Sequence, residues 1–475
     1  MRPLAAALVA GLALLAPAGA RAGDDVDLIP QGVLEPPTKA ATATDGARAA
    51  PASPGPKTLR TKLFAEDAFS AWSQPRGVPV AYPSPLPEWQ NRTSVDAVLQ
   101  WKPRPSLTVA LSDRLNVFEQ DGQDFASADT VRNDLREVSL TWEPTPGSYL
   151  EAGRINVRSG AALGYNPTDF FKTRTLVGQA SLDPSVIRQN RLGTLMLRAQ
   201  TLWSSGSASV AYAPKVAGPS PIAETNPVGI DPRFDATNAA HRVLCTLNFE
   251  VLDLSPQLLA YFELHRSKVG VNVTRSIGDA VVVYGEWAAG PEQGLIARAQ
   301  AFGRETGTLP PGAPLLPSTD SRTALRNDAA AGFSWTIGTA VTLNVEYHFH
   351  EAGFARGDWR SWFDLGSAHG VLTPITGALW FVRGYANDQQ EPVSQHQIFF
   401  RASWPRALVP DLELSTFAFV SLLDGSVLSQ LSAGYYVSDA WTASAYVSAN
   451  FGGARTERGS APQAGNAIVQ VTRYF

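Results

Sequence analysis

Apolar and polar residues alternate strictly through most of this chain. Residues 91–102 show the pattern: one face carries Val95, Leu99 and Trp101, and the other carries Arg92, Asp96 and Lys102. Residues 242–251 and 340–350 repeat it. A period of two predicts β-strands with one apolar face, and it does not fit a helix. The pattern alone fits either a soluble sandwich, with its polar face outside, or a membrane barrel, with its apolar face outside.

The connections between these strands alternate between tight and long, which predicts the topology. Tight turns are indicated at residues 102–105, 143–147, 204–206, 253–256, 278–279, 338–339, 404–411 and 438–439. The longer segments are residues 74–88, 120–133, 159–191, 214–240, 290–324, 351–391 and 452–465, with two further short connections near Ser267 and at Asp424-Gly425. We therefore expect an all-β fold, a transmembrane antiparallel up-and-down β-barrel of about eighteen strands with periplasmic N- and C-termini.

The N-terminal segment reads as a secretory leader. Arg2 precedes an apolar run from Leu4 to Leu15, and Ala20-Arg21-Ala22 forms a small-residue cleavage site. The run is too short to cross ~30 Å of hydrocarbon as a helix. Residues 23–57 are rich in Ala, Pro and Thr, which predicts a disordered periplasmic tail. The expected organisation is a signal peptide (1–22), this tail (23–57) and an outer-membrane barrel (58–475).

The last strand supports a membrane barrel. Val469, Val471 and Phe475 alternate with Gln470 and Thr472. A terminal Phe that closes such a strand resembles the C-terminal strand of bacterial outer-membrane barrels. The resemblance implies that Phe475 is the assembly signal read by the barrel-assembly machinery.

Composition excludes several other classes. The formal net charge of −4 argues against a nucleic-acid partner. Cys245 is the single cysteine, so no internal disulfide can form, and it falls on the apolar face of its strand. The chain has no CxxC, HExxH, Walker or GxSxG motif, and we expect no cofactor and no resident metal. Several tryptophans stand near strand ends, where the aromatic girdles of a membrane barrel form: Trp89, Trp101, Trp142, Trp203, Trp287, Trp335 and Trp404.

Strand parity gives a set of charged residues that should line the lumen. A barrel of this size encloses an aqueous channel, and facing rows of opposite charge would create a transverse field in it. Pairing across neighbouring strands is the alternative role of any one charge. The expected pore-lining residues are Arg92, Arg114, Arg154, Arg158, Arg198, Arg242, Arg326, Arg401, Glu263, Glu286, Glu346 and His348.

Residues 159–191 form the third outer loop, and we expect them to fold inward as a constriction. Gly160, Gly164 and Asn166-Pro167 break the strand, and Asp183-Pro184 predicts a helix start. An external loop packed on the rim is the alternative. The loop charges that would stand at the aperture are Asp169, Lys172, Arg174, Arg188 and Arg191. Residues 376–386 are a candidate for a second inward element.

Several short motifs carry a family resemblance. They are Gly153-Arg154 with Gly160, Asn166-Pro167-Thr168-Asp169, Glu346-Tyr347-His348 running into Gly353, Arg383 with Tyr385, and Asp424-Gly425-Ser426. On these residues the chain resembles a large porin-type outer-membrane channel, in the group that includes alginate-export-like barrels. Its resemblance covers residues 58–475. A terminal strand of this kind has an aromatic two residues before its last Phe, and here that position is Arg473.

The function we expect is passive diffusion of small or oligomeric polar solutes through a mixed-charge lumen. We expect outer-membrane lipid and lipopolysaccharide to surround the barrel. The sequence does not decide between a monomer and a homo-oligomer. The alternatives are an exporter of an anionic polysaccharide such as alginate, a transporter of hydrophobic ligands, and an outer-membrane hydrolase built on a Ser–His pair. Glu346, His348 and His350 share one strand face and form a candidate metal set.

Overall fold

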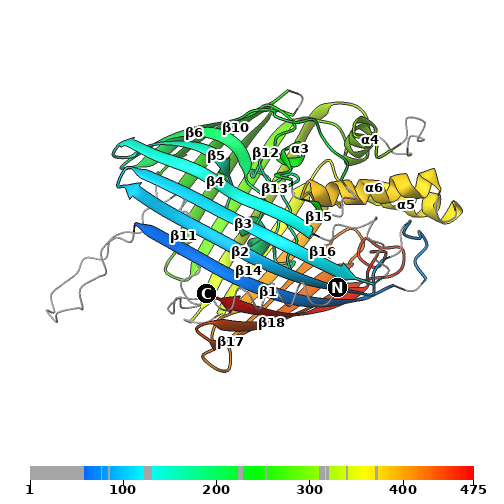
Figure 1. Ribbon diagram of the computed structural model, residues 1–475. Coiled ribbons are helices and arrows are strands. Elements are labelled where there is room, and N and C mark those ends of the chain that lie inside the picture. The colour runs from blue at the N-terminus through cyan, green and yellow to red at the C-terminus, as the bar shows by residue number, and fades with distance from the viewer. Residues whose placement is uncertain are drawn as a thin grey trace.

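The computed structural model describes residues 58–475, apart from 76, 84–85, 122–130, 223–227, 230, 252–253, 265, 310–315, 317–319, 339–340 and 370–372. The predicted leader (1–22) and tail (23–57) lie outside the described residues. Within the described part, the chain forms one closed antiparallel barrel with helices at one end (Figure 1).

The wall of the barrel consists of eighteen strands, as the alternation predicted. A nineteenth, two-residue strand, β8 (Val228–Gly229), pairs in parallel with the start of β4 and stands outside this ring. The wall strands are β1 (Leu59–Ser73), β2 (Trp89–Arg104), β3 (Leu107–Gln120), β4 (Val131–Thr145), β5 (Ser148–Ile155), β6 (Thr194–Trp203), β7 (Gly206–Ala213), β9 (Arg242–Phe249), β10 (Ser255–Glu263), β11 (Lys268–Ile277), β12 (Val281–Glu292), β13 (Ala324–Ile337), β14 (Val341–His350), β15 (His396–Trp404), β16 (Leu412–Ser421), β17 (Val427–Ser438), β18 (Trp441–Phe451) and β19 (Gly465–Tyr474).

The first and last strands close the ring. β1 pairs with β2 on one side and with β19 on the other, in a register that sets Phe64 opposite Tyr474. The backbone N–H of Phe475 donates to the carbonyl of Leu63 at 3.0 Å. Closure leaves no free sheet edge, so the backbone groups of the wall are paired within the barrel.

The outer face of the wall is apolar, and its side chains are exposed. Leu197 is 59% exposed, Leu247 40% and Val469 61%, whereas their inward neighbours Met196 and Gln470 are buried. A soluble protein rarely exposes apolar surface on this scale. Cys245 lies on the same outward face as Leu247, because both alternate with the inward-facing Leu244 and Thr246.

All eight predicted tight turns join strands at one end of the barrel, and the nine other connections lie at the opposite end. The three long helices are at that second end. The helices are α2 (Pro184–Gln189), α3 (Phe234–Thr237), α4 (Leu295–Glu305), α5 (Arg356–Ala368) and α6 (Pro374–Asp388). Among the residues described, no helix combines the length and apolarity needed to cross a membrane.

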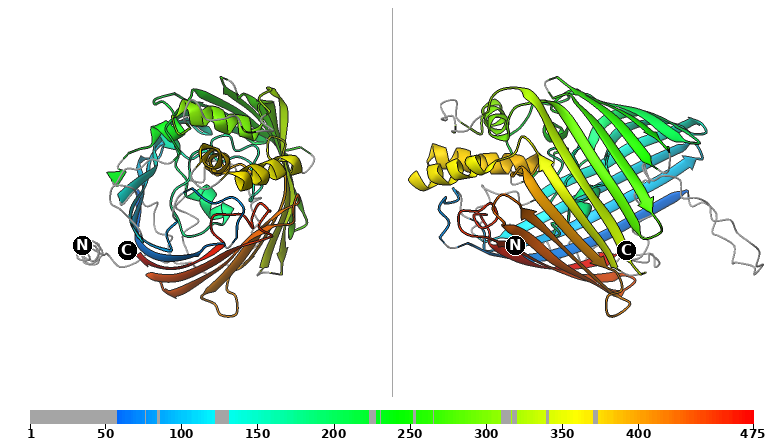
Figure 2. Two further views of the ribbon diagram at one scale, coloured as in Figure 1. Left: turned by 90° about the vertical axis from the view of Figure 1, so that its right-hand side faces the viewer. Right: turned by 180° about the vertical axis from the view of Figure 1, so that it is seen from behind.

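Helices α4, α5 and α6 form a helical cap over this end of the barrel, which Figure 2 (left) shows end-on. The cap has its own apolar core, in which Leu295, Trp362 and Leu379 are buried together with Val80 from the β1–β2 connection. Arg383 of α6 lies within the cap against the rings of Trp359, Trp362 and Trp380, 4.8–5.4 Å from their centroids. Burial lowers the pKa of Arg383 to about 10.

Candidate channel interior and its inward loop

The segment between β5 and β6, residues 156–193, lies inside the barrel (Figure 2). Its hydrogen bonds reach wall strands on several sides, among them β12, β14, β15, β17 and β3. Strands β5 and β14 lie almost opposite one another in the ring, so the segment crosses the lumen. We call residues 156–193 the inward loop.

Two carboxylates of the wall hold the first part of this loop by its backbone. Glu346 on β14 accepts the N–H groups of Leu163 at 2.6 Å and Gly164 at 2.9 Å. Glu286 on β12 accepts the N–H of Ala162 at 2.6 Å and the hydroxyl of Thr168 at 3.0 Å. Both carboxylates are buried, and charge-assisted bonds of this kind are stronger than neutral ones.

The backbone approaches the wall so closely that glycine is required. A Cβ on Gly164 would stand 2.6 Å from Cγ of Phe399 and 2.7 Å from Cε1 of His348. Gly160 has φ +83°, and a Cβ there would meet the carboxylate of Glu286 at 2.3 Å. These are two of the glycines that marked the loop in the sequence.

An apolar contact fixes the middle of the loop on a neighbouring part of the wall. Phe170 and Phe171 are buried in a cluster with Leu244 of β9 and Tyr261 of β10. The rings of Phe170 and Tyr261 stack with centroids 4.9 Å apart. The inward loop is therefore packed against the wall and bonded to it at the same time.

The loop then crosses toward β15–β17 and starts a short helix there. Asp183 caps α2 by accepting the N–H of Ser185 at 2.9 Å, and Pro184 takes the first position, so the predicted helix start is confirmed. The same carboxylate binds Arg401 of β15 at 2.8 Å. Gln430 of β17 accepts the N–H of Leu182 at 2.9 Å.

Internal ion pairs tie the two arms of the loop together. Asp169 binds Arg191 with both oxygens, at 2.8 and 3.0 Å, and Arg188 lies 3.8 Å away. Arg188 donates to the carbonyls of Ser159 at 2.7 Å and Gly160 at 2.8 Å.

Lys172 is a buried amine within the loop. It donates to the carbonyl of Asn166 at 2.6 Å and lies 4.1 Å from the ring centroid of Tyr165. Burial lowers the pKa of Lys172 to about 8, against the opposing effect of Asp169.

A row of arginines occupies the wall on β2–β4. Arg92, Arg114 and Arg136 all face inward, and their acidic partners are Glu66 and Asp96. Arg114 also donates to the carbonyl of Gly178 at 3.3 Å, which joins this row to the inward loop.

Two further arginines, which are partly exposed, continue this basic region. The side chains of Arg132 and Arg233 are 23% and 28% exposed, and they share the buried carboxylate of Asp134 at 3.3 and 3.8 Å. Arg174 of the inward loop binds Asp388 at the end of α6 at 3.1 Å, which joins the loop to the cap.

The other predicted site residues are dispersed. Arg154 donates to the carbonyls of Gly193 at 2.9 Å and of Pro232, and Arg242 donates to that of Thr237. Arg198 pairs with Glu151, Arg326 pairs with Asp320 at 2.6 Å, and Glu263 accepts from Tyr261. Arg158 lies beyond the end of β5, near the start of the inward loop, and is partly buried.

Sequence parity missed Arg136 and Asp134, which both face inward on β4. The cause is a break in register between β3 and β4, where Ser112 is opposite Glu137 but Asp113 is opposite Leu135. The bulge leaves Arg136 unpaired, so Arg136 and Glu137 do not alternate. Counting back from Glu137 therefore assigns the residues before it to the wrong face.

The two wall histidines are engaged with carboxylates. His348 lies 2.8 Å from Glu346, and His350 lies 2.6 Å from Asp328. Glu391, after α6, pairs with Arg298 at 2.7 Å and lies 3.7 Å from His350. Burial raises the pKa of Glu391, but Arg298 and His350 outweigh it and lower that pKa to about 2. No set of three metal-ligating side chains comes together among the described residues.

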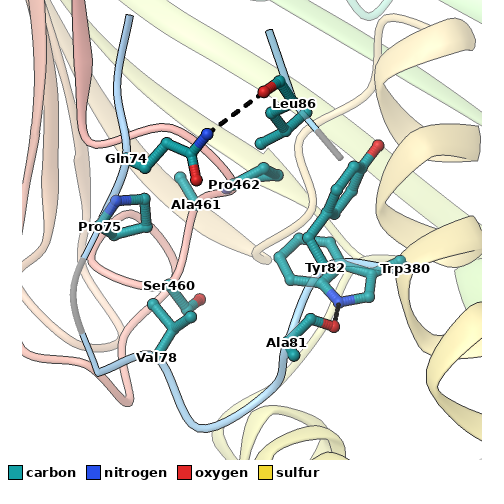
Figure 3. Close-up of a pocket in the computed structure, with 10 residues that line it drawn as sticks. All are labelled: Gln74, Pro75, Val78, Ala81, Tyr82, Leu86, Trp380, Ser460, Ala461 and Pro462. Carbon is teal, nitrogen blue, oxygen red and sulfur yellow. Dashed lines mark hydrogen bonds between the residues drawn. The ribbon is translucent and has the colours of Figure 1, made fainter. Parts of the chain in front are cut away.

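A cavity of 330 Å³ lies at the cap end, between the β1–β2 connection, α6 and the β18–β19 connection (Figure 3). Tyr82 and Trp380 form one side of it, with ring centroids 5.0 Å apart, and Gln74 and Pro462 face them. The indole N–H of Trp380 donates to the carbonyl of Ala81 at 2.9 Å.

Comparison with solved structures gives barrels of the same kind. Pseudomonas aeruginosa OccK11 (OpdR) matches with a TM-score of 0.50 and 10% identity, over 88% of this chain and 96% of that chain. The fold is that of a porin barrel. A triple mutant of the Rhodopseudomonas blastica porin matches with a TM-score of 0.39 and 10% identity, over 88% of this chain and 100% of that chain. No family model matches the chain, and no curated protein matches it.

Proposed function

We propose that this protein is an outer-membrane channel for passive diffusion of small or oligomeric polar solutes. The observation that carries the proposal is the combination of an apolar outer wall with a charged interior crossed by a fixed loop. An apolar exterior needs lipid around it, and a polar interior needs water or a polar solute.

The position in the membrane follows from the outer face. Exposed tryptophans gather at the tight-turn end of the apolar surface, as Trp101 and Trp142 do, whereas the exposed Trp287 lies in the middle of β12. A girdle of this kind forms at a membrane–water interface, so the tight turns lie at one of the two interfaces. In this arrangement the tight turns, the start of β1 and the end of β19 face the periplasm. The cap faces the outside of the cell.

The charge distribution favours solutes that carry charge or a strong dipole. The arginine row on β2–β4 and Arg154 on β5 stand on one side of the lumen, whereas Glu286 and Glu346 stand on the other. Fixed charges of opposite sign on facing walls orient polar solutes in a narrow passage. Many of these charges are paired and buried, so the field seen by a solute comes from the partly exposed groups. Foremost are Arg132 and Arg233, two arginines that share the single carboxylate of Asp134.

The inward loop is the proposed constriction. It crosses the lumen, it is held at both sides, and it carries Asp169, Lys172, Arg174, Arg188 and Arg191. The backbone N–H groups of Ala162, Leu163 and Gly164 fix one part of it on the wall without any of its charged side chains. An aperture of fixed size is what a size-selective passive channel needs.

The test is reconstitution of the purified protein in planar bilayers. We expect stepwise single-channel currents, and a reversal potential in a salt gradient that moves toward cations when Arg132 and Arg233 are both changed to Gln. Arg406→Gln, on the turn between β15 and β16, is the control that should leave selectivity unchanged. Absence of conductance from a correctly folded barrel would overturn the proposal.

The polysaccharide-export alternative makes a different demand on the lumen. An anionic polymer needs a wide basic path, whereas here the basic side faces buried carboxylates and a loop crosses between them. The hydrolase alternative needs a Ser–His pair. Within the described residues, His348 is bonded to Glu346, and no serine hydroxyl is hydrogen-bonded to it.

A further inference from the structure

Arg473 of β19 faces outward, away from the lumen. It shares the outer face of its strand with Val469 and Val471, which are exposed, whereas its neighbour Thr472 is buried. In the pairing of β18 with β19, Arg473 is opposite Trp441, the first residue of β18. Trp441 follows the tight turn between β17 and β18, so Arg473 lies at the tight-turn end of the apolar wall.

A second outward arginine lies at the same end of the barrel, on a distant part of the ring. Arg275 of β11 is opposite Val283 of β12, and the exposed Ile277 lies on the same face next to the turn. Within the described residues, neither Arg275 nor Arg473 has an ion-pair or hydrogen-bond partner for its guanidinium. A charged group that faces lipid without a partner in its own chain points to a ligand or a function.

The two arginines differ in how they are held. Cζ of Arg473 lies 4.9 Å from the ring centroid of Trp441 and 5.6 Å from that of Phe475. Contacts of a cation with aromatic rings fix the guanidinium and leave its N–H groups free to donate. Arg275 makes no such ring contact in the described part of the chain. Arg473 is therefore preorganised to bind an anion, and Arg275 is not.

A strip of apolar side chains runs from Arg473 toward the middle of the wall. Val471 is opposite Ala443, and Val469 is opposite Ala445, all on the outer face. Val469 and Val471 are 61% and 42% exposed, so the strip has no protein cover. An acyl chain that lies along this strip contacts apolar atoms throughout, while a headgroup at its end reaches the guanidinium.

We propose that Arg473, Trp441 and Phe475 form a binding site for the phosphate group of a phospholipid in the periplasmic leaflet. A phosphate diester accepts two parallel N–H groups of a guanidinium, which is a geometry that lysine does not offer. The proposal rests on the membrane orientation given under the proposed function, in which the tight turns face the periplasm. Lipopolysaccharide occupies the opposite leaflet, at the cap end.

Charge favours an anionic headgroup at this site. The headgroup of phosphatidylglycerol carries a single negative charge on its phosphate, which balances the single unpaired charge of Arg473. The ammonium group of phosphatidylethanolamine offsets the charge of its own phosphate. We therefore expect phosphatidylglycerol to bind more tightly than phosphatidylethanolamine.

Mass spectrometry of the intact, folded protein released from detergent tests the site. Purified protein is freed of lipid and titrated with phosphatidylglycerol. We expect the wild type to retain one lipid per chain, and Arg473→Gln to weaken that binding about tenfold or more, because two charge-assisted hydrogen bonds are lost. Arg473→Lys should bind with an affinity between the two. Arg275→Gln is the matched control, which should bind as the wild type does.

Two further comparisons separate the parts of the site. Trp441→Leu should weaken lipid binding, whereas Trp404→Leu, which changes another exposed tryptophan at the tight-turn end, should not. Phe475 is left unchanged because it closes the barrel. Inorganic phosphate at the concentration of the lipid should not displace it, since phosphate has no acyl chain. Displacement would show a site for free phosphate and overturn the proposal.

Other outcomes would also overturn it. These are a wild type that retains no phosphatidylglycerol, equal affinity in Arg473→Gln, an equal loss in Arg275→Gln, or tighter binding of lipopolysaccharide than of phosphatidylglycerol. If Arg473→Gln does not assemble, Arg473→Lys and Trp441→Leu decide by the same comparison. Lipid binding by a folded barrel that does not conduct would count against the proposed function alone, and conduction without lipid binding would count against this site alone.

Discussion

Glu346 on β14 accepts the backbone N–H of Gly164 at 2.9 Å, although 182 positions separate the two residues in the chain. This bond joins the wall to the inward loop without using a side chain of the loop. The bond can form because Gly164 has no Cβ. Phe399 and His348 fill the space that a Cβ at this position would occupy.

Gly164→Ala should therefore displace the inward loop. Overpacking a site of this kind costs about 1–3 kcal/mol, and here the loop can move away from the wall. We expect noisier single-channel currents and an altered conductance, with the barrel still folded. Gly377→Ala on α6 is the matched control, since a Cβ there meets nothing within 4 Å. Identical traces from Gly164→Ala and wild type would show that the contact does not position the loop.

Leu247 and Thr246 should respond differently to arginine. Leu247 is on the outer face and 40% exposed, whereas Thr246 faces inward and hydrogen-bonds Ser209 at 2.6 Å. Arginine at the bilayer midplane costs ~2–4 kcal/mol on a lipid-facing position. Leu247 lies two residues from the tight-turn end of β9, so Leu247→Arg should destabilise the folded barrel in bilayers by less than this midplane value, but by more than Thr246→Arg does. Equal losses, measured by urea titration in vesicles, would contradict the assigned faces.

Lys172 should make the channel sensitive to pH. Burial lowers its pKa to about 8, so the amine is charged at neutral pH and loses its proton as the pH rises through that value. Cation selectivity should increase across this interval in the wild type and not in Lys172→Met. The folded pKa lies below the ordinary value of 10.5, so the folded state binds fewer protons between the two values, and stability from this group rises with pH there. A reversal potential with the same pH dependence in both proteins would show that Lys172 does not lie at the aperture.

Phe475 should be needed for assembly. Its N–H donates to Leu63 on β1, so it stands where the last strand closes on the first. Removal of Phe475 should leave the chain in the periplasm, where it is degraded, whereas Tyr474→Phe should assemble. Fractionation with immunoblotting measures this. Wild-type levels in the outer membrane after the deletion would show that the terminal residue is not the signal.

Much of the wall could be predicted from the sequence because strand alternation is local. The alternation correctly predicted which strand face carries Arg92, Val243 and Glu346. The sequence also predicted the eight tight turns and the start of α2 at Asp183. These features depend on a few adjacent residues, and a barrel repeats them strand after strand.

The helical cap and the partners of the inward loop could not be predicted in the same way. Helix α6 carries a start signal at Thr373-Pro374, and the candidate inward segment 376–386 lies within it, but its packing on α4 and α5 depends on residues far away in sequence. The contacts of Glu286 with Ala162 and of Arg401 with Asp183 likewise join distant segments. A bulge, as at Arg136, reverses the face of the strand on which the residues beyond it lie, and nothing in the amino-acid composition marks its position.

The central claim is that the inward loop narrows a water-filled passage, and conductance after removal of residues 166–185 tests it most directly. The deletion removes Phe170 and Phe171, which pack on the wall, and Asp183, which binds Arg401. It leaves the wall strands intact. The account predicts stable single channels of at least twofold higher conductance, with weaker ion selectivity, from a barrel that folds normally. Unchanged conductance and selectivity in that folded barrel would contradict it.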